Sequence, residues 1–344
     1  MNVFVTGTDG YIGSVLVPLL VKAGHVVTGL DTGYYKDGWL YSRPKYSFES
    51  PRTIVKDLRM IELGDLQGID AIVHMAELSN DPLGENRPAI TNEINHLGSL
   101  RLAEMAKQAG IERFVYTSSC SVYGVSDAEF VDERSPTNPQ TAYARCKVLV
   151  ERDVGKLVDD NFSPVFLRNA TAYGASPRMR FDIVLNNLMG LAWATKKIAM
   201  TSDGSPWRPL VHVQDICTAI LCALEAPAHS IAGEIFNVGS TDENYTIREV
   251  AEIVASVVPG CEVSFGASGD DNRSYRVNFD KIKNSLSGFT CSWSLRDGAE
   301  ELQSVFEQID FDQSSFEFRA FTRLKQLKYL TATRQIDDRF FWTC

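Results

Sequence analysis

Residues 2–31 of the chain are NVFVTGTDGYIGSVLVPLLVKAGHVVTGLD. Its short apolar and β-branched runs predict strands over Asn2–Thr6 and His25–Leu30, and the longer run between them predicts a helix over Tyr11–Ala23. A strand, a helix and a second strand of these lengths form one unit of a parallel sheet.

Three glycines at the start of this helix predict a dinucleotide site. In the G-x-x-G-x-x-G pattern, Gly7 permits the tight turn, Gly10 lets a pyrophosphate approach the backbone, and Gly13 lets helix and strand pack closely. The helix N-terminus then presents N–H donors and a positive dipole to the phosphates. Asp31 ends the second strand, where a carboxylate can bond the ribose hydroxyls and would repel a 2′-phosphate. NAD is therefore favoured over NADP.

The alternation of strands and helices continues through the first half of the chain. Further strands are predicted at Thr53–Lys56, Ala71–Met75, Arg113–Ser118 and Pro164–Leu167, and helices at Pro88–Ala109 and Thr141–Asp159. This order predicts an α/β fold with a doubly wound, Rossmann-like parallel sheet that is covered on both faces.

The second half is expected to form a smaller α/β substrate-binding region. We expect a NAD-binding domain over residues 1–175, to which residues 208–240 return, and the substrate-binding region over residues 176–344. Helices are predicted there at Phe181–Thr195, Asp215–Glu225, Thr246–Val257 and Arg296–Gln308, with one more around Phe316–Leu330. Residues 309–344 receive no functional assignment.

Composition excludes several classes of function. The net charge of −10 argues against nucleic acid as a partner, because phosphate backbones require clustered Lys and Arg. No stretch approaches the roughly 20 apolar residues that span a bilayer, and the first strand directly follows Met1, which leaves no room for a signal peptide. A cytoplasmic protein is expected. The seven cysteines form no C-x-x-C pair and no cluster with histidines, so no metal site is predicted.

A second sequence pattern predicts the residues that would transfer a proton in the reaction. Tyr143 and Lys147 form Y-x-x-x-K in a predicted helix, where this spacing places both on one face. A nearby ammonium favours the phenolate and lowers its pKa, so that Tyr143 can take a proton from a hydroxyl. An isolated pattern of this kind also occurs on solvated helix faces. Here, however, the preceding strand runs into TSSCSVYG, residues 117–124, which places hydroxyls at the ligand-binding edge of the sheet.

Together these features resemble the extended short-chain dehydrogenase/reductases, in the NAD-dependent nucleotide-sugar epimerase/dehydratase group and closest to its UDP-glucose 4-epimerase-like members. The resemblance spans about residues 1–310. It is carried by Gly7, Gly10, Gly13, Asp31, HMAE (74–77), Asn95, Ser119, Tyr143, Lys147, LRNATAYG (167–174), WRPLVHVQD (207–215) and FNVG (236–239).

The resemblance implies a role for each matching residue. Tyr143 is the expected general base, Lys147 lowers its pKa and holds the nicotinamide ribose, and Ser119 bonds the reacting sugar oxygen. Hydride passes from a sugar carbon, most often C4, to NAD. Cofactor contacts are expected from Gly7, Gly10, Tyr11, Ile12, Gly13, Asp31, Asp57, Leu58, Met75, Ala76 and Asn95, besides Tyr143 and Lys147. Substrate contacts are expected from Ser121, Asn169, Asn187, Arg208 and Arg273. A homodimer through two helices, one of them carrying Tyr143, is also implied.

Departures from the group's pattern discriminate between reactions. Dehydratases carry an acidic residue two places after the catalytic Ser or Thr, where this chain has Ser121, and a hydroxyl cannot replace a carboxylate as acid and base. Cys120 lies one place before the position of the catalytic cysteine in 3,5-epimerases, so we expect it to pack in the core. Glu77 replaces the usual alanine, and the polar run that it begins is either a surface loop or a substrate contact.

The sequence thus predicts an enzyme that acts on a nucleoside diphosphate sugar, foremost a 4-epimerase. The alternatives are a 4-dehydrogenase or ketoreductase that releases a keto-sugar, a dehydratase, and a catalytically silent NAD-sensing protein.

Overall fold

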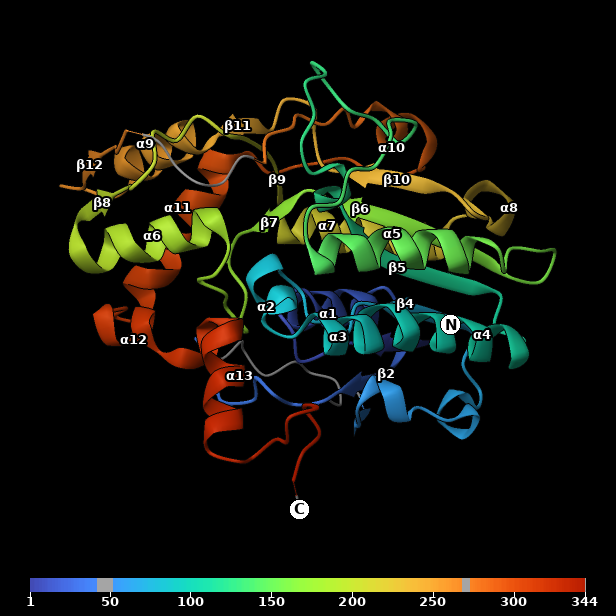
Figure 1. Cartoon of the computed structure of the whole chain (residues 1–344). Helices are drawn as coiled ribbons and strands as arrows, with labels where there is room; N and C mark the ends of the chain where they lie inside the picture. The colour runs from blue at the N-terminus through green and yellow to red at the C-terminus, as the bar shows by residue number, and fades with distance from the viewer. Residues whose placement is uncertain (42–51, 268–272, 344) are drawn as a thin grey trace.

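The computed structural model describes residues 1–41, 52–267 and 273–343. Its centre is a seven-stranded sheet in which every neighbouring pair runs parallel (Figure 1). The strands follow the order β10-β6-β5-β4-β1-β2-β3, which confirms the predicted doubly wound fold. Their bounds are β1 (Asn2–Thr6), β2 (Val26–Asp31), β3 (Arg52–Val55), β4 (Ala71–His74), β5 (Arg113–Ser119), β6 (Ser163–Asn169) and β10 (Ile235–Val238).

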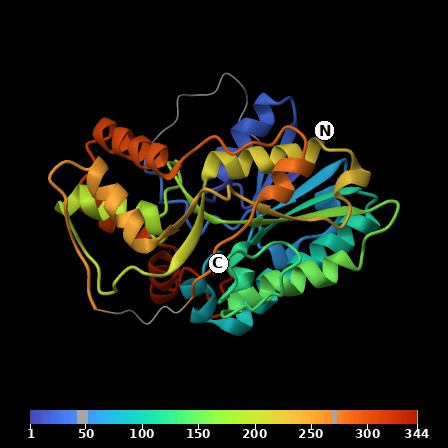
Figure 2. The ribbon, with the colours of Figure 1, turned by 90° about the horizontal axis from the view of Figure 1, so that it is seen from above.

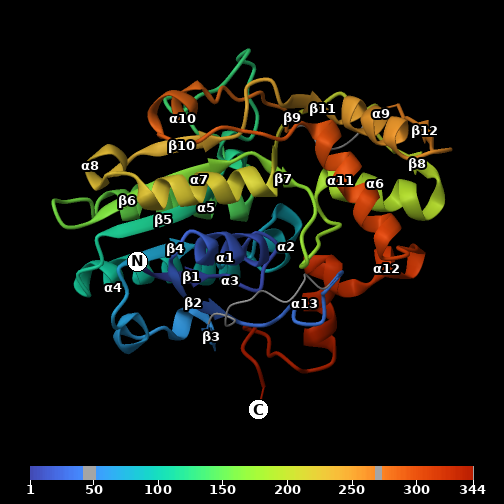
Figure 3. The ribbon, with the colours of Figure 1, turned by 180° about the vertical axis from the view of Figure 1, so that it is seen from behind.

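Helices cover both faces of this sheet, so its central strands are buried and apolar. In Figure 1 the helices α4 (Ser99–Gln108) and α5 (Ala142–Gly155) lie in front of it. In Figure 3 the helices α1 (Gly13–Lys22) and α7 (Val213–Glu225) cover the opposite face. The carboxyl ends of β1 and β4, where the strand order reverses, therefore open toward one edge, where ligands bind in folds of this kind.

The helix predicted over 88–109 is present but contains a turn of another kind. It runs as α3 (Pro88–Thr91), a π-helical stretch η3 (Asn92–Gly98) and α4. Such widened turns occur frequently at functional sites. Here the widened turn carries Asn95, whose side chain is fully buried and bonds the backbone of the segment after β4.

Beyond residue 175 the chain builds a second region from helices and small sheets (Figure 2). Three helices pack against one another: α6 (Val184–Thr195), α9 (Ile247–Val257) and α11 (Leu295–Gln308). A three-stranded sheet joins β7 (Thr171–Tyr173), β9 (Trp207–His212) and β11 (Asn244–Thr246), while β8 (Lys197–Ala199) pairs with β12 (Glu262–Ser264). Within the predicted return over 208–240, α7 and β10 join the large sheet, but β9 belongs to the small one.

The prediction of a single helix around Phe316–Leu330 is wrong, because the structure has two helices with a short turn between them. The structure has α12 (Gln313–Glu317), a 3₁₀ turn η5 (Arg319–Phe321) and α13 (Arg323–Ala332). Its aromatic residues break the helical pattern because Phe316 and Phe321 both turn inward onto Phe181, at ring distances of 5.2 and 5.8 Å. The break directs α13 toward α2 (Asp81–Asn86) (Figure 1).

The remaining short elements are connectors. They are η1 (Leu58–Met60), η2 (Leu63–Leu66), η4 (Cys120–Tyr123), α8 (Ala228–Ile231) and α10 (Asp280–Ser285). Within the described residues, none of the helices is both long and apolar enough to cross a membrane.

Candidate active site

The glycine-rich turn has the geometry that close approach of a dinucleotide requires. Gly7 has a φ of +82°, which side chains rarely allow. A Cβ at Gly13 would lie 2.2 Å from the Gly7 carbonyl oxygen, so only glycine fits there. The Asp31 carboxylate accepts hydrogen bonds from the backbone N–H of Asp9 (3.0 Å) and of Gly33 (2.8 Å). This carboxylate therefore joins the glycine turn to the end of β2.

One cavity of about 450 Å³ extends from this turn across the carboxyl edge of the sheet. It brings together nearly all of the predicted site residues, although they come from the whole length of the chain. Those in its wall are Gly7, Gly10, Tyr11, Ile12, Gly13, Asp31, Asp57, Leu58, Met75, Ala76, Ser119, Ser121, Tyr143, Lys147, Asn169, Arg208 and Arg273. The residues fit a dinucleotide, because backbone N–H groups, a ribose-binding carboxylate and small side chains line one end.

Asn95 and Asn187, also predicted contacts, do not belong to this wall. The Asn95 amide accepts from the Leu78 N–H at 2.9 Å and donates to the Leu78 carbonyl at 3.1 Å, so it orders the loop that follows β4. Asn187 donates to the Phe181 carbonyl at 2.8 Å at the start of α6. Both side chains therefore bond protein backbone in this structure.

Strand β5 and helix α5 place the three predicted catalytic residues together. Ser119 ends β5, and its side chain lies in the cavity wall, where it lowers the pKa of the Tyr143 phenol. Thr141 caps α5 by accepting a hydrogen bond from the Ala144 N–H. The helix therefore begins at Ala142, directly before Tyr143. Lys147 lies one turn later, with its Nζ 5.3 Å from the centre of the Tyr143 ring. The predicted Ser–Tyr–Lys arrangement is thus present at the cavity wall.

The net direction predicted for the Tyr143 pKa is wrong for the protein alone. Burial raises the pKa of this phenol, and the lowering by Lys147 and Ser119 does not overcome it. The carboxylates of Glu77 and Asp81 raise it further. The ammonium could be predicted from the spacing of Tyr143 and Lys147, but the burial of the phenol and the carboxylate beside it could not.

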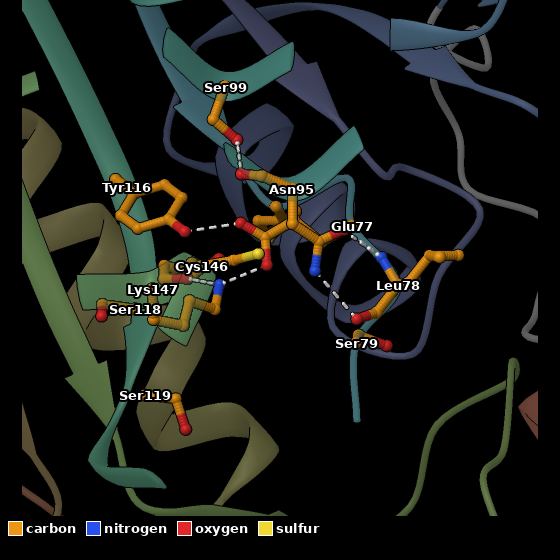
Figure 4. A network of polar contacts seen from close by, with 12 residues as sticks. Glu77, Leu78, Ser79, Asn95, Ser99, Tyr116, Ser118, Ser119, Cys146 and Lys147 are labelled. Atoms are coloured by element: carbon orange, nitrogen blue, oxygen red, sulfur yellow. Dashed lines mark hydrogen bonds and ion pairs between the residues drawn. The ribbon is translucent and has the colours of Figure 1, made fainter. Parts of the chain in front are cut away.

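That carboxylate belongs to Glu77, which is buried in the cavity wall, so the interpretation of a surface loop is wrong for this residue and a contact with the sugar stays a prediction. Its side chain is only 2% exposed, and its Oε2 lies 2.7 Å from the Lys147 Nζ (Figure 4). Its Oε1 accepts a hydrogen bond from the Tyr116 hydroxyl at 2.5 Å. Lys147 also donates to the Thr117 carbonyl at 2.5 Å, so β5 and the segment after β4 hold the ammonium together.

The substrate side of the cavity carries hydrogen-bonding atoms without a partner. Among the described residues, the buried Oγ of Ser121 and Oδ1 of Asn169 make no hydrogen bond within the protein. A buried polar atom without a bond is costly unless a ligand or water satisfies it. Both were predicted to contact the substrate, and their surroundings suit sugar hydroxyls.

Arg208 and Arg273, both predicted to contact the substrate, meet in the cavity wall. Arg208 donates to the Trp207 carbonyl at 2.8 Å and also to the carbonyl of Arg273. The Arg273 guanidinium pairs with Asp81. Arg273 thus makes an ion pair while it still lines the cavity.

Sequence reasoning missed two buried arginines in the cavity wall. Arg180 bonds Asp182 through Nε at 2.8 Å, whereas its buried Nη2 has no hydrogen-bond partner among the described residues. Arg323, 3% exposed, stacks 4.1 Å from the Tyr35 ring, and burial together with the charge of Arg180 lowers its pKa to about 10. The run SPRMRFD signalled positive charge near the site, but no pattern indicated that α13 reaches it.

The previously unassigned C-terminal segment covers the loop that follows β2. Gln326 donates to the Tyr34 carbonyl at 2.9 Å, and the Trp342 indole donates to the Thr32 carbonyl at 2.7 Å. The Arg59 guanidinium stacks 3.8 Å from the Phe341 ring. Residues 319–343 therefore hold the part of the chain that leads away from Asp31.

The cysteines and possible metal ligands give no second site. Cys120 is 1% exposed, its Sγ donates to the Arg168 carbonyl at 3.1 Å, and burial raises the pKa of its thiol, as expected of a packing residue. In residues 1–41, 52–267 and 273–343, no group of three His, Cys, Asp or Glu side chains could hold a metal ion.

Comparisons with known proteins agree with this geometry. A UDP-glucose 4-epimerase of Mycolicibacterium smegmatis is 32% identical over 271 residues, which are 75% of this chain and 83% of the relative. A dTDP-D-glucose 4,6-dehydratase of Mus musculus is 27% identical over 261 residues, 74% of this chain and 72% of the relative. The solved structure of MoeE5 in complex with UDP-glucose and NAD is 27% identical with a TM-score of 0.76, and the match covers 90% of this chain and 99% of MoeE5.

A family model described as the NAD dependent epimerase/dehydratase family matches residues 3–239. This match covers the glycine turn, Asp31 and the Ser119–Tyr143–Lys147 arrangement. The prediction of NAD as the cofactor is confirmed by this membership, since the family is NAD-dependent. The chain belongs to the NAD dependent epimerase/dehydratase family.

Proposed function

We propose that the protein is a nucleoside diphosphate sugar 4-epimerase that works through Ser119, Tyr143 and Lys147. The observation that carries the proposal is their meeting in one cavity, between a dinucleotide turn at one end and the unpartnered polar atoms of Ser121 and Asn169 at the other. Arg208 and Arg273 are the proposed contacts of the diphosphate, because a guanidinium matches phosphate oxygens through its planar fork.

In the proposed reaction, Tyr143 accepts the proton of the sugar C4 hydroxyl while Ser119 holds that oxygen. Bound NAD would supply the acceptor and the donor of the C4 hydride. The C4–H and O–H bonds break and a C4 carbonyl forms. Return of the hydride to the other face of the turned keto-sugar, with the proton of Tyr143 going back to oxygen, completes epimerisation and leaves NAD unchanged. Lys147 stabilises the phenolate and would bond the nicotinamide ribose.

The composition of the site favours epimerisation over elimination of water, although dehydratases are among the relatives. The stretch Ser119-Cys120-Ser121 offers no carboxylate, and Cys120 is buried with a raised thiol pKa. Among the described residues, the acidic groups of the cavity near Tyr143 are Glu77, Asp81 and Asp182, and each is bound to a lysine or an arginine. An elimination needs a carboxyl group that is free to exchange a proton.

The C-terminal segment also supports an epimerase. An enzyme that reuses its NAD in each turnover gains from slow release of the cofactor, and residues 319–343 cover the loop next to Asp31. We further propose a homodimer through α4 and α5, because the apolar side chain of Leu97, directly before α4, is 49% exposed. We also propose that the protein is cytoplasmic.

The test offers UDP-, GDP-, CDP- and dTDP-glucose to the purified protein with NAD, and follows sugars by NMR and NADH by absorbance. We expect a C4 epimer from one of them without lasting NADH. Stoichiometric NADH with a released keto-sugar would replace this proposal by a dehydrogenase. Bound NAD without conversion of any sugar would favour a silent NAD-sensing protein.

A further inference from the structure

Glu77, the carboxylate of the buried ion pair beside the proposed base, has no role in the reaction described above. Glu77 and Lys147 have side-chain exposures of only 2% and 4%, and their charged atoms are 2.7 Å apart. The Tyr116 hydroxyl fixes the other carboxylate oxygen, and its ring lies 4.6 Å from the Lys147 Nζ (Figure 4). In the resembling group this position is usually alanine, so the carboxylate is a feature that this chain adds to the site.

We propose that Glu77 is a positioning residue of the active site, which anchors the Lys147 ammonium and sets the pH at which Tyr143 accepts a proton. The inference rests on the proposed role of Tyr143 as the base. Glu77 touches neither reacting atom, and it acts through Lys147.

The contacts of Lys147 support the proposed anchoring role of Glu77. One N–H of Lys147 donates to the Thr117 carbonyl, and the ammonium forms an ion pair with Glu77 at 2.7 Å, so N–H bonds remain for the cofactor ribose or the phenol. A lysine side chain has several rotatable bonds, and two contacts, one from β5 and one from the segment after β4, restrict the position of its ammonium. The ammonium is thereby held beside Tyr143, with its Nζ 5.3 Å from the centre of the phenol ring.

The charges of Glu77 and Lys147 support the proposed effect of Glu77 on the pH at which Tyr143 accepts a proton. Burial lowers the pKa of the Lys147 ammonium, but the charge of Glu77 and the Tyr143 phenol outweigh this, and the net pKa is raised. Burial raises the pKa of the Glu77 carboxyl, with Lys147 and Tyr116 opposing. Because Tyr143 and Lys147 titrate as a coupled pair, an adjacent negative charge raises the apparent pKa of the pair whichever group releases the proton. Removing that charge must lower it.

Other ionisable groups around the pair leave this sign unchanged. His74 stays neutral because burial lowers its pKa to about 3, and Glu151 is bound to Arg168 at 2.7 Å. Among the described residues, the ionisable groups that act on Glu77, Lys147 or Tyr143 include His74, Asp81, Tyr116, Cys146, Glu151 and Arg180. Each of these is common to the wild type and to a variant at position 77.

The experiment compares Glu77→Gln with Glu77→Asp in the full-length enzyme. Glutamine keeps the size of the side chain but removes the charge, so we expect the acidic limb of the kcat/KM profile to move to lower pH by about one unit or more. Aspartate keeps the charge and should leave the limb near its wild-type position. An unmoved limb in Glu77→Gln, or an equal loss of activity at every pH, would overturn the proposal and leave Glu77 a purely structural residue.

A second measurement serves if Glu77→Gln has too little activity. The Tyr143 phenol is titrated by ultraviolet difference absorbance, with Tyr143→Phe in the same background subtracted, and thermal unfolding confirms that each variant is folded. A lower apparent pKa in Glu77→Gln supports the proposal, and an unchanged or higher one contradicts it. Failure of the proposed function is distinguishable, because then Tyr143→Phe itself would remain active.

Discussion

Tyr143→Phe is expected to reduce turnover by about 10²–10⁴-fold while NAD binding remains. The substitution removes only the hydroxyl that would take the proton of the sugar, and Tyr143 lies in the cavity wall. Turnover is measured by NMR of the sugar product, and NAD binding by equilibrium dialysis.

The matched control is Tyr173→Phe. This tyrosine is fully buried, lies outside the cavity wall, and donates to the Trp293 carbonyl at 3.3 Å. It should lose about 1 kcal/mol of stability and little activity. Comparable turnover in Tyr143→Phe and the wild type would exclude Tyr143 as the base.

Gly13→Ala is expected to impair both folding and NAD binding. An added Cβ would lie 2.2 Å from the Gly7 carbonyl oxygen and 2.7 Å from that of Thr8, so the glycine turn must shift. Overpacking of this kind costs about 1–3 kcal/mol of folding free energy. A displaced turn also misaligns the N–H groups that would face the pyrophosphate. Thermal unfolding and NAD titration measure the two effects.

Gly155→Ala is the control for this prediction. Gly155 ends α5, and a Cβ there would meet no heavy atom within 4 Å. Alanine should therefore leave NAD affinity unchanged and stabilise the helix by up to about 1 kcal/mol. Equal NAD affinities of Gly13→Ala and the wild type would show that the turn does not hold the cofactor.

The large sheet and the cofactor turn could be predicted because their signals are local. Alternating apolar strands and helices, the glycine spacing and Asp31 each depend on neighbouring residues alone, and the structure places them as expected. The Tyr143–Lys147 pair could be predicted for the same reason, because its spacing of four residues is about one helical turn.

The electrostatics of the site could not be read in this way. Glu77 meets Lys147 across 70 positions of sequence, and the contact depends on how β4 and β5 align. Arg323 reaches the cavity because the aromatic residues before it break the helix and redirect the chain. Asn95 was assigned to the cofactor from resemblance, but the widened turn aims it at the Leu78 backbone.

The most direct test of the proposed function uses a sugar labelled with deuterium at C4, in the nucleotide form that the protein accepts. Oxidation and return of the same hydride at C4 predict an epimer that keeps the deuterium at C4, with none lost to solvent and no lasting NADH. Deuterium found at C6 of a dehydrated product, or in released reduced cofactor beside a keto-sugar, would contradict the account.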